Sequence, residues 1–240
     1  MAIEQEAENV LWDLEHLKEA RGLTRWMFEQ FEDDVKGRVL EVGAGIGTFS
    51  ELLLEKPIDL LLAMEPWEPC LEVLERQFGA NDRVTVIGEA LPGAPSLAGQ
   101  ESTVDFALCQ NVLEHIGDDL GALRAMAATL KPGGRLHLLV PANPGLYGPL
   151  DKAYGHFRRY TKSVLRERLL LAGFEIDDLY SFNALGIPGW WVQNRRGANA
   201  EISSASLQAY EMLLRAWKPV EQRWRPPIGL SVIARARKPA

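Results

Sequence analysis

Short apolar runs alternate with stretches of helical periodicity along much of the chain. The apolar runs predict strands at residues 38–42, 58–64, 84–87, 104–109, 135–140, 174–180 and 230–236. Between them, helical patterns cover residues 49–55, 69–78, 120–130 and 163–172, and the Lys-Pro-Gly-Gly run at 131–134 predicts a helix stop followed by a turn. This alternation is typical of parallel βαβ units. We therefore expect an α/β fold with a seven-stranded, mostly parallel sheet and helices on both faces.

Two segments lie outside this alternation. Residues 5–35 place apolar side chains near helical spacing, which predicts an N-terminal helical cap of one or two amphipathic helices. Residues 182–228 form a tryptophan-rich insertion before the last strand, with a helical middle at 204–217. We interpret 1–240 as one domain in which the cap precedes a core at 36–181, the insertion forms a lid, and 229–240 supply the last strand.

Composition narrows the range of functions. The formal net charge of −7 argues against a phosphate-binding surface, so we expect no nucleic-acid partner. Cys70 and Cys109 are too few for a disulfide scaffold or a zinc site, and we predict no metal centre and a reducing, cytoplasmic location. No apolar run approaches the roughly 18 residues of a spanning helix, so we expect neither export nor membrane insertion.

A glycine-rich loop follows the first predicted strand. The strand ends in Glu41 and Val42, and the loop Gly43-Ala44-Gly45-Ile46-Gly47 then opens a helix whose first amides are free to meet a ligand. A dinucleotide fingerprint would need a further glycine at position 48, where this chain has Thr48. The loop therefore favours a nucleotide-like cofactor other than NAD or FAD.

Polar residues also stand at the ends of the next three predicted strands. Glu65, which is followed by Pro66, comes 18 residues after the last loop glycine, Gly47. This is close to the spacing of ~20 residues expected for an acid that binds the ribose. Glu89, followed by Ala90, is placed to receive an adenine amino group. Gln110 and Asn111 end the fourth strand, and we expect them to face the same cleft. His115 is a candidate base just beyond them, because an imidazole ordinarily titrates near pH ~6.5.

Taken together, these residues form a known series of motifs. The segments LEVGAGIG, AMEP, GEALP, VDFALCQNVLEHI and LKPGGRLHLLVP resemble those of class I S-adenosylmethionine-dependent methyltransferases, over roughly residues 36 to 140. The segments at 24–27, 146–148, 155–161, 182–186 and 189–191 are similar to those of a bacterial subgroup of type 11/12-like methyltransferases. The resemblance implies a Rossmann-like class I methyltransferase fold and S-adenosylmethionine as the cofactor.

The resemblance also implies roles for particular residues. The loop glycines would lie against the methionine part of the cofactor with Glu41 near its amino group, Glu65 would hold the ribose, and Asn111 would contact the methionine end. The expected cofactor site comprises Glu41, Gly43, Ala44, Gly45, Gly47, Glu65, Pro66, Glu89, Ala90, Gln110, Asn111 and Val112.

The acceptor should approach the same edge of the sheet, between the segment 141–161 and the insertion. His115, His156 and Tyr160 are the candidate catalytic residues, and Arg159, Trp190 and Trp191 the candidate substrate ligands. Because methyl transfer needs mainly alignment, worth up to roughly 7–11 kcal/mol, a dedicated base is optional.

We expect a methyltransferase acting on a small-molecule acceptor, with no prediction for the oligomeric state. Three alternatives remain open. A nucleotide-cofactor oxidoreductase is disfavoured by Thr48. A non-catalytic S-adenosylmethionine-binding module would carry the same motifs. The tryptophan-rich insertion would also suit peripheral contact with a membrane and a lipid-like acceptor, although the acidic composition opposes this.

Overall fold

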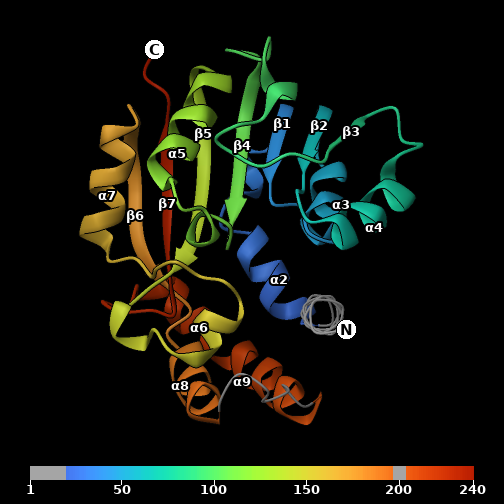
Figure 1. Ribbon diagram of the computed structural model, residues 1–240. Helices are drawn as coiled ribbons and strands as arrows, with labels where there is room; N and C mark the ends of the chain where they lie inside the picture. Colours follow the sequence, from blue (N-terminus) through green and yellow to red (C-terminus); the bar gives the residue numbers. More distant parts are fainter. Residues whose placement is uncertain (1–19, 197–203) are drawn as a thin grey trace.

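The computed structural model describes residues 20–196 and 204–240, and a seven-stranded sheet forms its centre (Figure 1). The strand order is β3-β2-β1-β4-β5-β7-β6, and β7 is antiparallel to both of its neighbours. The strands are β1 (Gly37–Val42), β2 (Ile58–Met64), β3 (Val84–Ile87), β4 (Val104–Gln110), β5 (Leu130–Pro141), β6 (Glu175–Phe182) and β7 (Ser231–Arg237). The predicted α/β class, with a mostly parallel sheet of seven strands, is confirmed.

Helices cover both faces of this sheet. They are α2 (Arg21–Phe28), α3 (Thr48–Leu54), α4 (Glu68–Phe78), α5 (Asp119–Thr129), α6 (Pro149–Ala153), α7 (Lys162–Leu171), α8 (Gly186–Arg196) and α9 (Ser204–Arg223). Short 3-10 turns add η1 (Glu32–Asp34), η2 (Pro95–Leu97), η3 (Leu113–His115) and η4 (Pro144–Leu146). The helices predicted within the core are confirmed to within a few residues.

Alternating strand residues divide the core between the two faces. In β1, Leu40 packs in a cluster with residues of α5 and α7, whereas Val39 faces the cluster formed with α2, α3 and α4. On that second face, Trp26 of α2 and Leu214 of α9 pack together against the end of the sheet formed by β5, β7 and β6. The helical cap and the insertion are therefore packed against each other.

The predicted turn at 131–134 is wrong, because α5 ends at Thr129 and β5 begins at Leu130. The pairing of β4 with β5 shifts register after the Val104–Leu130 pair, and Gly133 takes a left-handed φ of 76°. An irregularity of this kind allows a Pro-Gly-Gly run to lie inside a strand. The Pro-Gly-Gly run does interrupt the regular pairing, but as an irregularity within β5 rather than as a turn before it.

The insertion contains more helix than its pattern predicts. The expected helical middle at 204–217 lies within α9, which runs past Pro219 to Arg223. The helix α8 was not predicted, and it begins where Asn183 accepts a hydrogen bond from the Gly186 amide at 2.9 Å. Of the predicted N-terminal cap, residues 5–19 lie outside the described part of the chain.

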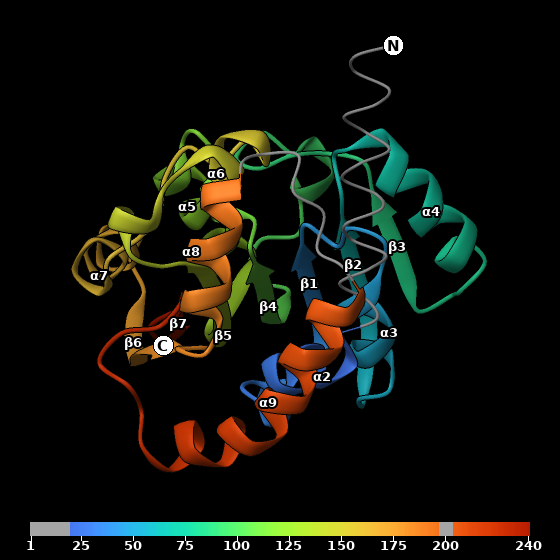
Figure 2. The same ribbon diagram turned by 90° about the horizontal axis from the view of Figure 1, so that it is seen from below.

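The carboxyl ends of the parallel strands face the viewer in Figure 2, and α6, α8 and α9 surround this edge. Strand order reverses between β1 and β4, and open α/β sheets bind ligands at such a switch point. Across the residues that the structure describes, no helix combines the length and the apolar character needed to cross a bilayer.

Candidate active site

The glycine loop joins β1 to α3 at the switch point. Gly43, Gly45 and Gly47 have φ angles of 74°, 56° and 84°, a left-handed region that favours glycine. A Cβ atom on Gly43 would lie 2.2 Å from Val112, and one on Gly47 would lie 2.4 Å from Phe78, whereas nothing stands within 4 Å of that position on Gly45. The loop is thus packed at both ends and open at its centre, where a ligand can approach the backbone.

Two buried carboxyl groups support this loop from below. Glu41 is 3% exposed and accepts a 2.6 Å hydrogen bond from the Ser50 hydroxyl. Burial raises the pKa of Glu41 to about 8, although the Ser50 hydroxyl opposes the shift; the charge of Glu65 adds to it. A buried acid that holds its proton near neutral pH would ionise readily beside a bound cationic group.

Glu65 braces the glycine loop against the end of β2. Its carboxylate accepts hydrogen bonds from the Gly45 amide at 2.8 Å and from the Trp67 amide at 2.9 Å. Burial raises the pKa of Glu65, and these two amides oppose the shift. The loop is also tied to β2 because the amides of Gly43 and Ala44 donate to the Met64 carbonyl at 2.9 and 2.8 Å.

The end of β3 is more open. Glu89 accepts hydrogen bonds from the amide and the hydroxyl of Ser96, at 2.9 and 2.8 Å, so its carboxylate is held within its own loop. Its neighbour Ala90 is exposed, as is Pro66 beyond β2. These residues line the edge of the candidate site rather than its centre.

The end of β4 carries an unsatisfied polar group. Both the Oε1 and the Nε2 atoms of Gln110 are buried and have no hydrogen-bond partner among the described residues. Asn111 follows with a left-handed φ of 52°, and its amide donates to the Leu139 carbonyl at 2.9 Å. Since buried amides nearly always find partners, the Gln110 side chain suits a ligand that supplies both an acceptor and a donor.

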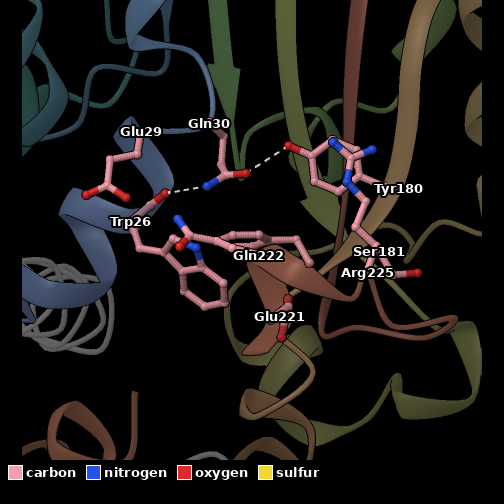
Figure 3. A pocket seen from close by; sticks show the side chains of 9 residues that line it. Trp26, Glu29, Gln30, Tyr180, Ser181, Glu221, Gln222 and Arg225 are labelled. Atoms are coloured by element: carbon pink, nitrogen blue, oxygen red, sulfur yellow. Dashed lines mark hydrogen bonds between the residues drawn. The ribbon is translucent and has the colours of Figure 1, made fainter. Parts of the chain in front are cut away.

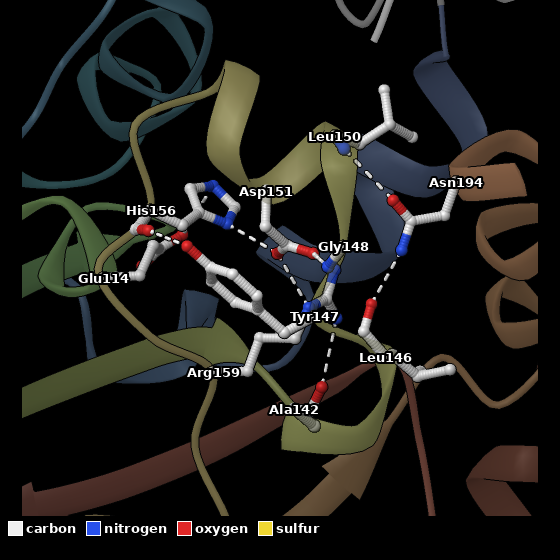
Figure 4. Close-up of polar contacts among 10 residues, drawn as sticks. All are labelled: Glu114, Ala142, Leu146, Tyr147, Gly148, Leu150, Asp151, His156, Arg159 and Asn194. Atoms are coloured by element: carbon white, nitrogen blue, oxygen red, sulfur yellow. Dashed lines mark hydrogen bonds and ion pairs between the residues drawn. The ribbon is translucent and has the colours of Figure 1, made fainter. Parts of the chain in front are cut away.

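Beyond β4, two histidines meet on the side of the site where the acceptor is expected, called here the acceptor side. The rings of His115 and His156 lie edge to face, with centroids 4.6 Å apart. Burial lowers the pKa of His115 to about 4, and the nearby His156 adds to the shift, so His115 is neutral at physiological pH. The Nδ1 atom of His156 lies 2.9 Å from the Asp151 carboxylate, which fixes the orientation of its ring (Figure 4).

Two acidic residues that were not predicted complete this cluster. The Glu114 side chain is 0% exposed, lies 4.0 Å from His156 Nε2, and has no hydrogen-bond partner among the described residues. Burial raises the pKa of Glu114 to about 8. Glu114 was visible beside His115 in the motif. Asp151 precedes its partners His156 and Arg159 by only a few residues, but no motif or periodic pattern marked it.

The structure places Tyr160 in the core, which corrects the expectation that it reaches the acceptor. Tyr160 is 0% exposed, and its hydroxyl donates to Asp119 at 3.0 Å. Burial raises the pKa of the phenol. A fully enclosed hydroxyl that is already bonded stabilises the packing of η3 against α5 and cannot act as a base.

The predicted substrate ligands fall into two different environments. Arg159 is only 6% exposed and donates to Asp151 at 2.7 Å and to the Ala142 carbonyl at 3.0 Å, so it anchors the loop. Its guanidinium lies 4.5 Å from the ring centre of Trp190. Trp191 is instead 46% exposed, with Arg195 over its ring. Trp190 therefore joins the loop network, whereas Trp191 faces outward.

Asn194 of helix α8 binds the loop around residues 146–150. The Asn194 amide donates to the Leu146 carbonyl at 2.8 Å and accepts from the Leu150 amide at 3.1 Å (Figure 4). This contact connects the segment 141–161 to α8 of the insertion, the two parts of the chain between which the acceptor is expected.

A separate pocket lies between α2, β6 and α9 (Figure 3). Its lining includes Gln30, which donates to the Trp26 carbonyl at 2.9 Å and accepts from the Tyr180 hydroxyl at 3.0 Å. None of the predicted cofactor or acceptor residues lines it.

Comparison with known proteins now bears on this arrangement. A family model described as a methyltransferase domain matches residues 14–179, which is more than half of the chain. The chain belongs to this methyltransferase family. The expected class I S-adenosylmethionine-dependent methyltransferase is thus confirmed, and the family implies that this methyltransferase binds S-adenosylmethionine or S-adenosylhomocysteine.

Individual relatives are distant from this methyltransferase. It is 34% identical over 97 residues to the ubiquinone biosynthesis O-methyltransferase of Bordetella avium, a match covering 40% of this chain and 39% of that one. The chain spans only 39% to 53% of the length of the first two curated relatives.

Solved structures show the same fold. YcgJ of Bacillus subtilis has a TM-score of 0.60 at 16% identity, covering 90% of this chain and 98% of its own. Phosphoethanolamine N-methyltransferase 2 of Haemonchus contortus, in complex with S-adenosylhomocysteine, has a TM-score of 0.54 at 19% identity, covering 86% of this chain and 50% of its own.

Proposed function

We propose that this methyltransferase binds S-adenosylmethionine at the ends of β1 to β4 and transfers the methyl group to a hydroxyl of a small molecule held against η3 and the segment 141–161. The observation that carries the proposal is the left-handed backbone at Gly45, open on its ligand side, together with the buried Gln110 amide at the end of the neighbouring strand, which has no partner among the described residues. A hydroxyl acceptor is supported by the O-methyltransferase named among the relatives.

The residues present fit the cofactor by their chemistry. Glu41 is a buried acid beneath the loop, suited to meet an amino group, and Glu65 holds the Gly45 amide in place while its carboxylate faces the same edge. Glu89, Ala90 and Pro66 border the region expected to hold the adenine, with Asn111 and Val112 on the opposite side. When bound, the cofactor supplies an activated methyl group on a sulfonium.

The protein's contribution is alignment and exclusion of water. The positive charge of the sulfonium is lost from sulfur as the methyl group moves to the acceptor, so a site that holds the acceptor in line needs little covalent machinery. His156, oriented by Asp151, and the neutral His115 are the groups placed to remove a hydroxyl proton. Trp190 and the loop at 144–150 would close the acceptor side.

The first test is calorimetric titration with S-adenosylhomocysteine and with NAD. We expect binding of S-adenosylhomocysteine and none of NAD, because the loop lacks the third glycine of a pyrophosphate site. Tighter binding of NAD would contradict the cofactor assignment.

The second test measures transfer of a tritiated methyl group to a panel of mono- and dihydroxylated aromatic compounds, with matched amines. Transfer to hydroxyl compounds supports the proposal, and transfer to amines alone would contradict the acceptor class. Cofactor binding with no transfer to any acceptor would favour the non-catalytic binding module.

A lipid-like acceptor is the second candidate, and exposed apolar side chains on α8, on α9 and directly after α9 favour it. Trp191, Met212 and Trp224 are 46%, 70% and 57% exposed. Co-sedimentation with anionic phosphatidylglycerol vesicles tests it, and a protein that stays in the supernatant would exclude membrane contact under those conditions.

A further inference from the structure

Three potential metal ligands meet at the acceptor side of the site. One ligand atom from each of Glu114, His115 and His156 lies within 4.8 Å of the other two. Glu114 and His115 belong to η3, and His156 lies in the loop after α6, so residues far apart in the sequence are brought together. No metal centre was expected from the sequence, because Cys70 and Cys109 are too few for a zinc site.

Glu114 is the residue that requires an explanation. Its side chain is 0% exposed, and neither carboxylate oxygen has a hydrogen-bond partner among the described residues. The nearest cationic side chain, Arg159, is already bonded to Asp151 at 2.7 Å. A buried carboxylate is costly unless it is paired or coordinates a metal. Its Oε1 atom lies 4.0 Å from His156 Nε2.

His156 is held as metal-binding histidines usually are. Its Nδ1 atom lies 2.9 Å from Asp151, which leaves Nε2 directed toward Glu114 (Figure 4). Histidines that bind metals commonly donate their other ring nitrogen to a carboxylate, which fixes the tautomer and the ring orientation. Asp151 is itself held by the Gly148 amide at 3.0 Å and by Arg159.

We propose that Glu114, His115 and His156 bind a divalent transition-metal cation. Two imidazoles and one carboxylate suit zinc, iron or manganese, and such a set leaves coordination positions open. Bonds of about 2.1 Å allow one cation to bridge atoms up to about 4.2 Å apart, which the Glu114–His156 pair satisfies. A ring nitrogen of His115 lies within 4.8 Å of the ligand atoms of Glu114 and His156, so this side chain has to move closer for one cation to bind all three.

The open positions would face the acceptor. If the proposed transfer to a hydroxyl is correct, on which this role rests, the cation would bind the acceptor oxygen and lower its pKa, so that the proton passes to water and the oxygen attacks as an oxyanion. In the metal-bound form His115 and His156 would be ligands, and the cation would replace them as the group that activates the hydroxyl. The metal site itself does not depend on that reaction, and it is measured without an acceptor.

Cobalt provides a direct probe. The protein is stripped with a chelator, dialysed and titrated with Co²⁺ while visible absorption is followed, and Zn²⁺ is then added as competitor. We expect absorption bands that saturate near one equivalent and are displaced by Zn²⁺. The variants Glu114→Gln and His156→Asn should lose these bands, whereas the exposed control Glu101→Gln should keep them.

Asp151→Asn separates a positioning role from coordination, with an expected loss of about 10- to 100-fold in metal affinity. Melting curves confirm that each variant folds. Absence of saturable binding in the wild type, or unchanged binding in folded Glu114→Gln, would overturn the proposal. S-Adenosylhomocysteine binding is titrated on the same samples: if it persists without metal binding, the metal proposal alone fails, and the reverse result removes only the cofactor assignment.

Discussion

The cofactor side and the acceptor side of the site differ in how their acids are satisfied. Under the glycine loop, Glu65 is bonded to two backbone amides and Glu41 to a hydroxyl, so the loop is held in shape by the protein itself. On the acceptor side, Glu114 is equally buried but has no hydrogen-bond partner among the described residues. The first region holds its loop through hydrogen bonds of its own acids, whereas the second contains a buried acid that the proposed cation would satisfy.

This difference predicts opposite effects of substitution on the two sides. Replacing His156 by asparagine should reduce methyl transfer by about 10²- to 10⁴-fold, the usual contribution of a positioned acid or base. S-Adenosylhomocysteine affinity should stay within about twofold, because His156 lies on the acceptor side. Rates of transfer from tritiated cofactor and calorimetric titration provide the two measurements. If S-adenosylhomocysteine affinity fell as much as the rate of methyl transfer, His156 would support the cofactor as well, which would contradict the difference between the two sides.

Glu41 should make stability depend on pH. Its folded pKa, about 8, exceeds the ordinary value of 4.5, so the folded state holds a proton that the unfolded state releases. Below pH 4.5 this proton stabilises the folded state by its full amount. The contribution then falls as the pH rises from 4.5 to about 8. Glu41→Gln should therefore be more stable than the wild type by a few kcal/mol at pH 8, with no difference at pH 4.5.

Urea unfolding across this range measures the effect, and parallel profiles for the two proteins would contradict it. The same variant should bind S-adenosylhomocysteine more weakly, because glutamine offers no charge to an amino group. Greater stability with weaker binding would mark Glu41 as a residue retained for function.

Glu65→Ala should weaken S-adenosylhomocysteine binding by roughly 1.5–3 kcal/mol, or about 10- to 150-fold, since hydrogen bonds to a charged group are lost. The Gly45 amide would also lose its support. The exposed residue Glu72 of α4 is the matched control, and Glu72→Ala should leave the titration unchanged. An unaltered affinity in Glu65→Ala would assign that carboxylate to loop structure alone.

Gly45→Ala should have the smallest effect on the fold, destabilising it by about 1–2 kcal/mol because alanine is strained at a left-handed φ. No neighbour within 4 Å adds a clash. Gly47→Ala, which would meet Phe78, should melt at a lower temperature than Gly45→Ala. If Gly45→Ala binds the cofactor as well as the wild type, the open centre of the loop is not the approach route.

Local patterns were sufficient for the sheet, and they placed the glycine loop and the strand-end acids at one edge of it. The strands alternate with helices, and the glycine loop and the strand-end acids are adjacent to the elements that position them. The acceptor side was harder because its contacts are long-range. Glu114 in η3 meets His156 only in the folded chain, and the Tyr160 hydroxyl donates to Asp119, a residue that lies far earlier in the sequence.

The position of β7 has a consequence for how the chain folds. Among the described residues, strand β6 pairs with β7 alone, and β7 joins it to β5. Residues 175–182 therefore have no partner strand in this sheet until residues 231–237 are present. During synthesis, β1 to β5 can assemble as the chain emerges, whereas β6 must wait for the insertion with α8 and α9 to be completed. Such non-local pairing slows folding. We therefore expect α8 and its contacts with the segment 141–161 to form after the glycine loop.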